Sequence, residues 1–287
     1  MTKRAVVTGA NSGIGLATAL RLAADGFEVW AGARSADGLA AIDQAAAGVG
    51  HDGVRSVRID VTSDESVAAA FAAIQAEGPV DVLVNNAGIT GAGSVEETPL
   101  ATYQAMFDTN VLGVVRCIQQ VLPGMREARS GRIVNISSSS AIQSPPLMAP
   151  YATTKMAVEG ISESLQAEVA EYGIRVIAIQ AGTILTPIWG KNPPPPEDTP
   201  YPAARDFLLK VLSHQLMNSG VPAETVADVI ADAVAADAPP LRHLVGDAQH
   251  LAELQADHGD DVIDAFFLDS EAFRHRYAEM AGIDYWA

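Results

Sequence analysis

The sequence predicts an α/β protein in which a doubly wound (Rossmann) parallel sheet of about seven strands carries helices on both faces. The first observation is that short β-rich runs alternate with longer helical stretches from the first residues onward. The second is that each run is almost continuously apolar, as strands buried on both faces of a parallel sheet must be. The third is helical spacing of apolar residues between the runs, for example at Leu16, Leu20 and Ala23. Helices covering both faces of such a sheet make a doubly wound fold.

The strands expected in this sheet follow in chain order. They are residues 4–8, 27–33, 54–60, 80–86, 132–137, 174–181 and 241–245. Thr62 followed by Glu65 is a capping-box pattern, which predicts the start of a helix directly after the third strand. Asp60 and Val61 then lie at the tip of that strand. Ligands bind outside the carboxyl ends of strands in open α/β sheets, so such tips are where chemistry is expected.

The rest of the chain is expected to join the same single domain, residues 1–287. The stretch 190–202 contains four consecutive prolines and cannot form regular structure. Within 190–218 we expect a substrate loop, which is either a surface linker or a lid over the site. Residues 222–239 have a helical pattern, and residues 247–287 are expected to form a helical C-terminal extension.

Composition excludes several classes of function. Eighteen Lys and Arg against 35 Asp and Glu leave a net charge of −17, which repels nucleic acid and anionic lipid. The single cysteine, Cys117, permits no internal disulfide and favours a reducing compartment. No signal peptide or membrane span is evident, so a cytoplasmic protein without a membrane partner is expected. The six histidines are scattered without ligand spacing, so no metal is predicted.

The turn after the first strand has the composition of a phosphate-binding loop. It contains Gly9, Gly13 and Gly15 in "TGANSGIG", between a strand and a helix. Glycine lets the backbone approach a ligand closely, and a helix N-terminus favours an anion such as pyrophosphate. The alternative is a glycine turn that serves packing only.

The tip of the second strand indicates which dinucleotide is bound. It carries Arg34 and no acidic residue that could accept hydrogen bonds from a ribose 2′-hydroxyl. A guanidinium can bind a 2′-phosphate through two hydrogen bonds, so NADP(H) is favoured over NAD(H). The alternative is an ordinary solvated arginine.

Tyr151 and Lys155 are the candidate acid-base pair. They stand four residues apart at the head of a predicted helix, so both side chains rise from one face. A nearby ammonium favours phenolate, and we therefore expect Lys155 to lower the pKa of Tyr151.

Together these motifs resemble those of the short-chain dehydrogenases/reductases, in order, over residues 3–189. The matching motifs are "TGANSGIG", Asp60-Val61, "NNAG" at 85–88, Asn110, Ser138 and "YATTK" at 151–155. The resemblance implies catalytic roles for Tyr151, Lys155, Ser138 and Asn110. It implies cofactor binding by Gly9, Asn11, Ser12, Gly13, Ile14, Gly15, Arg34, Asp60, Val61, Asn86, Ala87, Gly88, Tyr151, Lys155, Gly182, Ile184 and Thr186. The family's usual Pro-Gly after the sixth strand is Ala181-Gly182 here, which predicts a looser loop at the nicotinamide.

The resemblance also implies an activity. The expected reaction is NADP(H)-dependent interconversion of a ketone or aldehyde and an alcohol, on an apolar or cyclic substrate like those of steroid and retinol dehydrogenases. The alternatives are a β-ketoacyl-thioester reductase and a non-catalytic NADP(H)-binding regulator. The family's two long helices, here about 101–127 and 153–172, commonly pair between subunits, so a homodimer or homotetramer is expected.

Overall fold

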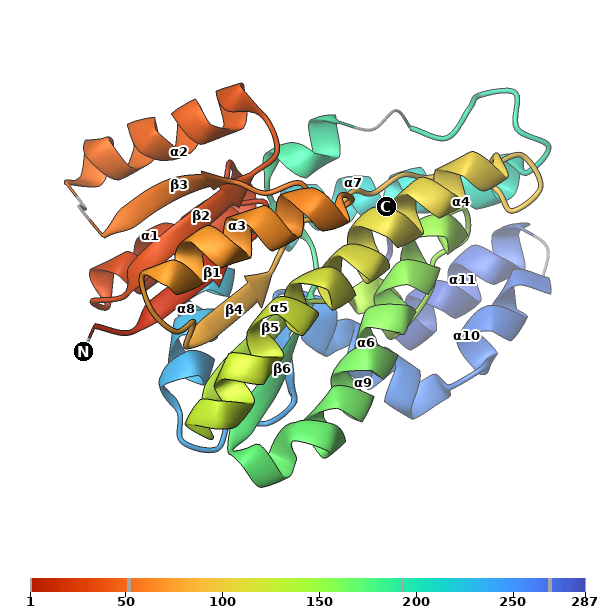
Figure 1. The fold of residues 1–287 in the computed structure, drawn as a ribbon. Helices are drawn as coiled ribbons and strands as arrows, with labels where there is room; N and C mark the ends of the chain where they lie inside the picture. Colours follow the sequence, from red (N-terminus) through yellow and green to blue (C-terminus); the bar gives the residue numbers. More distant parts are fainter. Residues whose placement is uncertain (1, 51–52, 192–193, 268–269, 287) are drawn as a thin grey trace.

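The computed structural model of this protein describes residues 2–50, 53–191, 194–267 and 270–286. Its main sheet has seven strands, all parallel, in the order β3-β2-β1-β4-β5-β6-β9 (Figure 1). These strands are β1 (Arg4–Val7), β2 (Glu28–Ala33), β3 (Val54–Arg58), β4 (Val82–Asn85), β5 (Gly131–Ile136), β6 (Ile174–Ala181) and β9 (Arg242–Val245). The seven predicted strands are therefore all present, and the doubly wound fold is confirmed.

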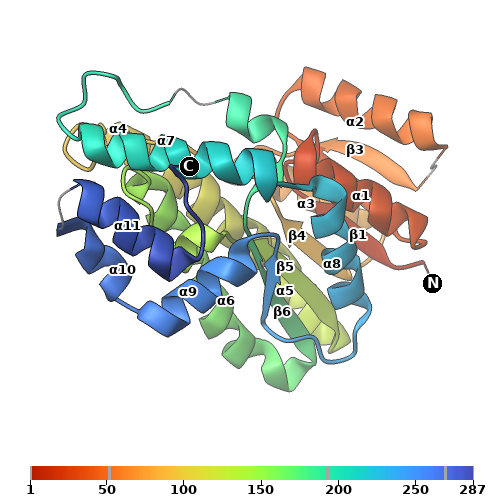
Figure 2. The same cartoon turned by 180° about the vertical axis from the view of Figure 1, so that it is seen from behind.

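Helices cover both faces of the sheet. The α-helices in the described part of the chain are α1 (Gly13–Ala24), α2 (Ala36–Val49), α3 (Asp64–Ala76), α4 (Leu100–Phe107), α5 (Gly113–Ala128), α6 (Ala149–Val169), α7 (Pro202–Asn218), α8 (Ala223–Ala235), α9 (Ala248–His258), α10 (Asp261–Asp264) and α11 (Ser270–Ala281). Figure 1 shows α3, α5 and α6 in front of the sheet, and Figure 2 shows α1 and α8 on its other face. Each face has its own buried core, one containing Phe71 and the other Ile230. Burial of these apolar side chains is the main force that holds helices to sheet.

The third crossover helix begins one residue later than the capping-box pattern predicts. Ser63 is the N-cap of α3, and its Oγ accepts a hydrogen bond of 3.1 Å from the backbone N–H of Ser66. The hydroxyl of Thr62 instead donates to Asp60 Oδ1 at 2.7 Å. The prediction of Thr62 as the cap is wrong, because the Thr62 hydroxyl is hydrogen-bonded to Asp60 at the tip of the preceding strand.

The long helix expected at about 101–127 is interrupted. A π-helical turn, Asp108–Leu112, separates α4 from α5 and contains Asn110, which is only 1% exposed. Such turns insert one extra residue into a helix and are frequent at functional sites. Asn110 in this turn is hydrogen-bonded to the backbone of Ile89, which follows β4.

The C-terminal helices α9, α10 and α11 pack with α7 beside the sheet rather than on it (Figure 2). Their shared cluster consists of Phe207, Val211, Leu254, Val262, Ala265, Phe273, Tyr277, Met280, Ala281 and Tyr285. Helices are therefore present across the expected extension, of which residues 268, 269 and 287 lie outside the described part. A second, two-stranded sheet joins β7 (Ile184–Leu185) to β8 (Val221–Pro222). Strands of two residues leave no periodic pattern, so the sequence did not predict them.

The proline-rich loop forms no helix or strand over residues 194–201, as predicted, and residues 192 and 193 lie outside the described part. Two hydrogen bonds attach its end to the segment after β4. Thr199 Oγ1 donates to Glu97 Oε2 at 2.7 Å, and the Tyr201 hydroxyl donates to Glu96 Oε2 at 2.5 Å. Helix α7 then begins at Pro202, a position where proline is preorganised for a helix.

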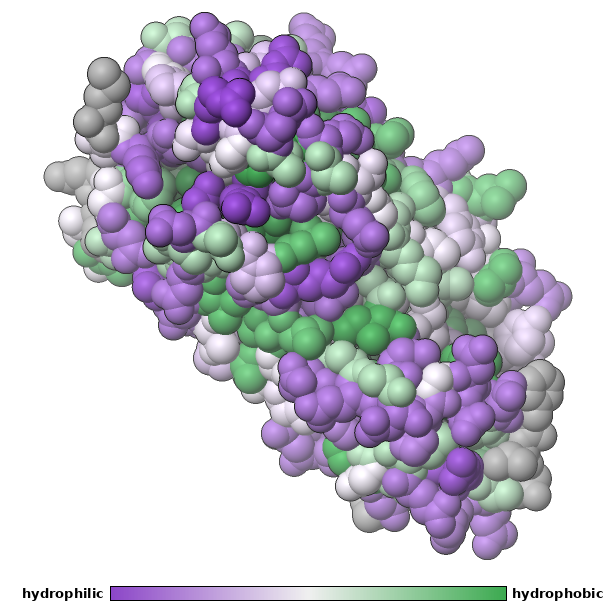
Figure 3. All heavy atoms as spheres, turned by 90° about the horizontal axis from the view of Figure 1, so that it is seen from below, coloured by the Kyte–Doolittle hydropathy of each residue, from purple (hydrophilic) through white to green (hydrophobic). Residues whose placement is uncertain are grey.

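The face shown in Figure 3 is largely hydrophilic, and a band of hydrophobic residues crosses it between two hydrophilic regions. No helix in the described part of the chain is long and apolar enough to span a membrane.

Candidate active site

The candidate site is a cavity of about 590 Å³ at the carboxyl ends of the strands. Its wall includes nearly all of the residues that the sequence singles out: Gly9, Asn11, Ser12, Gly13, Ile14, Arg34, Asp60, Val61, Asn86, Ala87, Gly88, Ser138, Tyr151, Lys155, Gly182, Ile184 and Thr186. Residues that follow strands β1 to β6 are therefore brought together. Gly15 and Asn110 are not part of the wall and lie behind it.

The glycine-rich turn connects β1 to α1 at one end of the cavity. Gly9 and Gly13 have φ of +64° and +57°, in the region that favours glycine. At Gly15 the constraint is space, because a β-carbon there would lie 2.6 Å from the carbonyl oxygen of Gly9. Ser12 is the N-cap of α1 and its side chain makes no capping hydrogen bond. The first backbone N–H groups of α1 are thus available to an anion.

Asn86 holds this turn against β4. Its side-chain amide nitrogen donates hydrogen bonds to the carbonyl oxygens of Thr8 and Gly9 at 2.9 and 3.0 Å. The side chain of Thr8 in turn accepts from the backbone N–H groups of Asn86 and Ala87, each at 3.0 Å. Asn86 and Ala87 therefore fix the backbone of the turn across neighbouring strands.

Asp60 and Arg34 lie at the tips of β3 and β2. The hydrogen bond from the Thr62 hydroxyl is the largest cause that lowers the pKa of Asp60, and the positive charges of Arg34 and Arg58 add to it. Arg34 is exposed, and in the described part of the chain its guanidinium forms no hydrogen bond or ion pair. It is a free cation on the cavity wall at this end.

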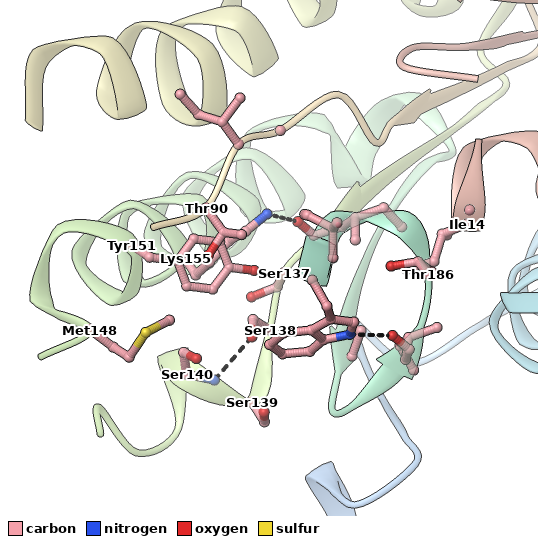
Figure 4. A pocket seen from close by; sticks show the side chains of 18 of the residues that line it. Ile14, Thr90, Ser137, Ser138, Ser139, Ser140, Met148, Tyr151, Lys155 and Thr186 are labelled. Atoms are coloured by element: carbon pink, nitrogen blue, oxygen red, sulfur yellow. Dashed lines mark hydrogen bonds between the residues drawn. The ribbon is translucent and has the colours of Figure 1, made fainter. Parts of the chain in front are cut away.

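The middle of the cavity holds Tyr151, Lys155 and Ser138 (Figure 4). Tyr151 and Lys155 come from the first turns of α6, with Lys155 Nζ 5.6 Å from the centre of the Tyr151 ring. Ser138 follows β5, and its Oγ accepts a hydrogen bond of 3.1 Å from the backbone N–H of Ser140. The neighbouring Ser137 also lines the cavity, and its buried hydroxyl has no partner among the described residues.

The expected effect of Lys155 on the pKa of Tyr151 is not found. Burial raises the pKa of Tyr151, and only its hydrogen bond with Ser138 acts in the lowering direction. Burial also lowers the pKa of Lys155 to about 8, against the opposing charge of Glu159. Lys155 Nζ itself donates a hydrogen bond of 2.7 Å to the carbonyl oxygen of Ile136. In this structure Tyr151 is therefore a protonated phenol at neutral pH.

Asn110 supports the site from behind. Its Oδ1 accepts from the backbone N–H of Ile89 at 2.8 Å, and its Nδ2 donates to the carbonyl oxygen of Ile89 at 2.8 Å. The same Nδ2 donates to Thr154 Oγ1 at 3.0 Å. Asn110 thus joins the segment after β4 to the helix that carries Tyr151 and Lys155. Thr154 lies within "YATTK" and Ile89 directly follows "NNAG", but neither was singled out, because their contacts with Asn110 join segments far apart in the sequence.

The far end of the cavity is apolar. Its wall is formed by α7 and the C-terminal helices, through Phe207, Leu208, Val211, Leu212, Leu251, Ile263, Phe266 and Tyr277. The rings of Phe207 and Phe266 meet edge to face with centroids 5.1 Å apart, and those of Phe207 and Tyr277 at 5.0 Å. The α7 residues of this wall lie within 190–218, where the sequence predicts a substrate loop; residues 202–218 of that segment form helix α7.

Cations are few on the cavity wall. Arg34, Lys155 and Lys191 are the lysines and arginines among the described residues that line it. Within the described ranges, no group of three or more His, Cys, Asp and Glu side chains could hold a metal ion.

Comparison with known proteins gives consistent matches along most of the chain. A family model described as short chain dehydrogenase matches residues 3–196. Retinol dehydrogenase 8 of Bos taurus is 35% identical over 248 residues, covering 83% of this chain and 79% of that protein. The structure of a short-chain dehydrogenase from Streptomyces avermitilis matches with a TM-score of 0.82 and 32% identity, over 93% of this chain and 96% of the other. A structure of actinorhodin polyketide ketoreductase with NADPH matches with a TM-score of 0.74 and 33% identity, over 85% and 95%.

Proposed function

Because this chain belongs to the short-chain dehydrogenase family and is an oxidoreductase, we propose that it uses NADP(H) to interconvert a ketone or aldehyde and an alcohol on an apolar or cyclic substrate. The observation that carries the proposal is the single cavity. It runs from the glycine-rich turn, past Tyr151 and Ser138, to the apolar wall formed by α7 and the C-terminal helices. A dinucleotide site, an acid-base group and an apolar chamber thus lie along one continuous cavity.

The residues at the dinucleotide end fit NADP(H). The uncapped N-terminus of α1, which begins at Gly13 with a φ of +57° on the cavity wall, suits a pyrophosphate. The unpaired guanidinium of Arg34 suits a 2′-phosphate, and the solved structure of the similar polyketide ketoreductase contains NADPH. In this proposal Asp60 and Val61 contact the adenine, and Ile184 and Thr186 contact the nicotinamide amide. When bound, NADP(H) supplies or accepts the hydride.

The chain's own groups handle the proton. In the direction of reduction, the phenol of Tyr151 donates its proton to the substrate oxygen, a step for which a raised pKa keeps it protonated. The hydroxyl of Ser138 donates a hydrogen bond to the same oxygen and stabilises the charge that develops there. Lys155, with a pKa of about 8, is mostly an ammonium at neutral pH, and in this proposal it binds the ribose of the nicotinamide. Asn110 acts as a positioning residue through Ile89 and Thr154.

The apolar wall supports the substrate class. Aromatic and aliphatic side chains dominate the far end of the cavity, and such pockets recognise apolar molecules by shape with few polar contacts. Residues 190–218 are proposed to cover this end as a lid, on the strength of the hydrogen bonds of Thr199 and Tyr201 to the segment after β4. A β-ketoacyl thioester on an acidic carrier would require a basic docking surface, which a net charge of −17 disfavours.

A substrate screen with both coenzymes tests the proposal. Cyclic and long-chain ketones, the corresponding alcohols and an acetoacetyl thioester are assayed with NADPH and NADH, for wild type and for Tyr151→Phe. We expect turnover of apolar ketones with NADPH that Tyr151→Phe abolishes. Preferred turnover of the thioester would favour the ketoacyl reductase instead. Binding of NADPH, seen by its fluorescence, without turnover of any substrate would favour a non-catalytic regulator.

We also propose a homodimer or homotetramer that pairs α4, α5 and α6 between subunits. Large apolar side chains are exposed here, namely Leu100 in α4, Leu112 in the π-helical turn between α4 and α5, and Met156 in α6. Light scattering that shows a monomer at micromolar concentration would contradict this part. A cytoplasmic location completes the proposal and is supported by the single cysteine, Cys117, which is buried.

A further inference from the structure

The segment that follows β6 is held by a carboxylate far away in the sequence. Asp247 Oδ1 accepts a hydrogen bond of 2.7 Å from the backbone N–H of Thr183, and Asp247 Oδ2 accepts one of 2.8 Å from Thr183 Oγ1. Thr183 is 4% exposed, so these bonds are shielded from water. Hydrogen bonds to a charged acceptor are about twice as strong as neutral ones. Both carboxylate oxygens of Asp247 are therefore committed to one residue.

The neighbouring Gly182 shows how closely the two segments approach. Its backbone N–H donates to the carbonyl oxygen of Val245 at 2.9 Å. A β-carbon at residue 182 would lie 2.7 Å from the backbone nitrogen of Ala248, a backbone atom that cannot easily move. Only glycine permits this contact. Ala181 stands where the family usually has proline, which predicted a looser loop. The turn between β9 and α9 instead holds this loop in place.

This contact links the two halves of the cavity. On one side, Thr183 leads into Ile184 and Thr186, which line the dinucleotide part. On the other, Asp247 is the N-cap of α9, whose Leu251 lines the apolar part. The C-terminal segment also lies close to Asp247. Burial, assisted by the charge of Asp247, raises the pKa of Tyr285 in this segment to about 12. Asp247 therefore connects segment 182–186, at the dinucleotide part of the cavity, to the helix that contributes Leu251 to the apolar wall.

We propose that Asp247 is a positioning residue that holds segment 182–186 in the conformation that receives the nicotinamide. The inference rests on the proposed function, in which Ile184 and Thr186 contact that ring. Without the carboxylate, the buried N–H and hydroxyl of Thr183 lose their acceptors, and the segment must be ordered again each time the coenzyme binds. The adenosine end of the cavity, formed by Arg34 and Asp60, shares no contact with Asp247 and is unaffected.

Binding of two ligands distinguishes this role from a general structural one. NADPH occupies both ends of the dinucleotide site, whereas adenosine 2′,5′-bisphosphate carries only the adenosine and phosphate end. Dissociation constants for both are measured by titration calorimetry on wild type, Asp247→Ala, Asp247→Asn and Thr183→Val. The matched control is Asp260→Ala, which removes an exposed carboxylate at the start of α10 in the same extension.

We expect Asp247→Ala to weaken NADPH binding by about tenfold to a hundredfold, the loss typical of hydrogen bonds to a charged group. Adenosine 2′,5′-bisphosphate should bind within about twofold of wild type. Asp247→Asn, which keeps one acceptor, should recover part of the NADPH affinity, and Asp260→Ala should resemble wild type. In steady-state assays the coenzyme KM should rise more than kcat falls.

Two results would overturn the inference while leaving the proposed function intact. One is an unchanged NADPH affinity in both Asp247→Ala and Thr183→Val. The other is an equal loss for both ligands, which would mean that Asp247 only stabilises the fold. If Asp247→Ala does not fold, as circular dichroism would show, Thr183→Val and Asp247→Asn decide the question. If wild type binds neither ligand, the proposed function and this inference fail together.

Discussion

The side-chain amide of Asn110 donates a hydrogen bond of 3.0 Å to the hydroxyl of Thr154, across 44 residues of sequence. Thr154 Oγ1 donates in turn to the carbonyl oxygen of Tyr151 at 2.7 Å. The π-helical turn at Asp108–Leu112 is therefore linked directly to the first turn of the helix that bears Tyr151 and Lys155. A residue that does not line the cavity can in this way orient residues that do.

Replacing Asn110 by leucine should destabilise the folded protein and also lower its catalytic rate. The change leaves the N–H and carbonyl of Ile89 without their present partner, at about 1–3 kcal/mol for each group left unpaired, and it removes one of the two hydrogen bonds of the Thr154 hydroxyl. We expect a loss of at least about 2 kcal/mol in the free energy of unfolding, measured in urea. Thr154→Val removes one of these contacts and should cost less. A loss for Thr154→Val as large as that for Asn110→Leu would contradict this account.

Tyr151→Phe should remove catalysis without removing coenzyme binding. A positioned acid or base contributes about a hundredfold to ten-thousandfold, so kcat for ketone reduction should fall by that factor. The phenyl ring keeps the packing of Tyr151 against Lys155, and NADPH affinity should stay within about threefold of wild type. Single-turnover kinetics and fluorescence titration measure the two quantities. Full activity in Tyr151→Phe would exclude the proposed proton donor.

The rate of reduction should fall as the pH rises through about 8. Burial depresses the pKa of Lys155 to about 8, so the proposed ammonium is present below that pH and is lost above it. The charge of Glu159 raises this pKa, and Glu159→Gln should therefore move the fall in rate to lower pH. The pH profile of kcat for the two proteins checks the shift. An identical pH profile for the two proteins would show that a group other than Lys155 causes the fall in rate.

Arg34→Ala should reduce the preference for NADPH over NADH. The loss of a bidentate contact to a phosphate should raise the KM for NADPH about tenfold or more and leave that for NADH nearly unchanged. Arg58→Ala is the matched control, because Arg58 is exposed on the neighbouring strand end and does not line the cavity. Equal effects of the two changes on the NADPH preference would mean that net charge alone matters.

The apolar wall can be tested by two substitutions on one helix. Phe207 is 4% exposed and packs in the aromatic cluster, so Phe207→Ala should cost about 3–5 kcal/mol of stability. Leu212 is only partly buried on the cavity wall, so Leu212→Ala should leave the thermal midpoint nearly unchanged. It should raise the KM for large apolar ketones more than for small ones. An unchanged KM for both sizes would place the substrate elsewhere.

The sequence by itself determined where the seven strands and the crossover helices lie along the chain, and which segments lie at the sheet edge. Those features follow from local patterns: continuous apolar runs for the seven strands, helical spacing between them, and short motifs such as the glycine-rich turn and the Tyr151–Lys155 pair. Parallel strands bring their carboxyl ends to one edge, so residues 9, 60, 86 and 138 had to meet there.

Tertiary structure decided the rest. The clamp from Asp247 to Thr183 spans 64 residues, and Asn110 reaches Thr154 over 44, so neither contact leaves a periodic or local pattern. The apolar wall joins α7 to helices about 50 residues later. The pKa of Tyr151 is raised, opposite to expectation, because burial, which depends on the whole fold, outweighs the hydrogen bond with Ser138. Distance in space and exclusion of water set these properties, and only packing of the complete chain determines either.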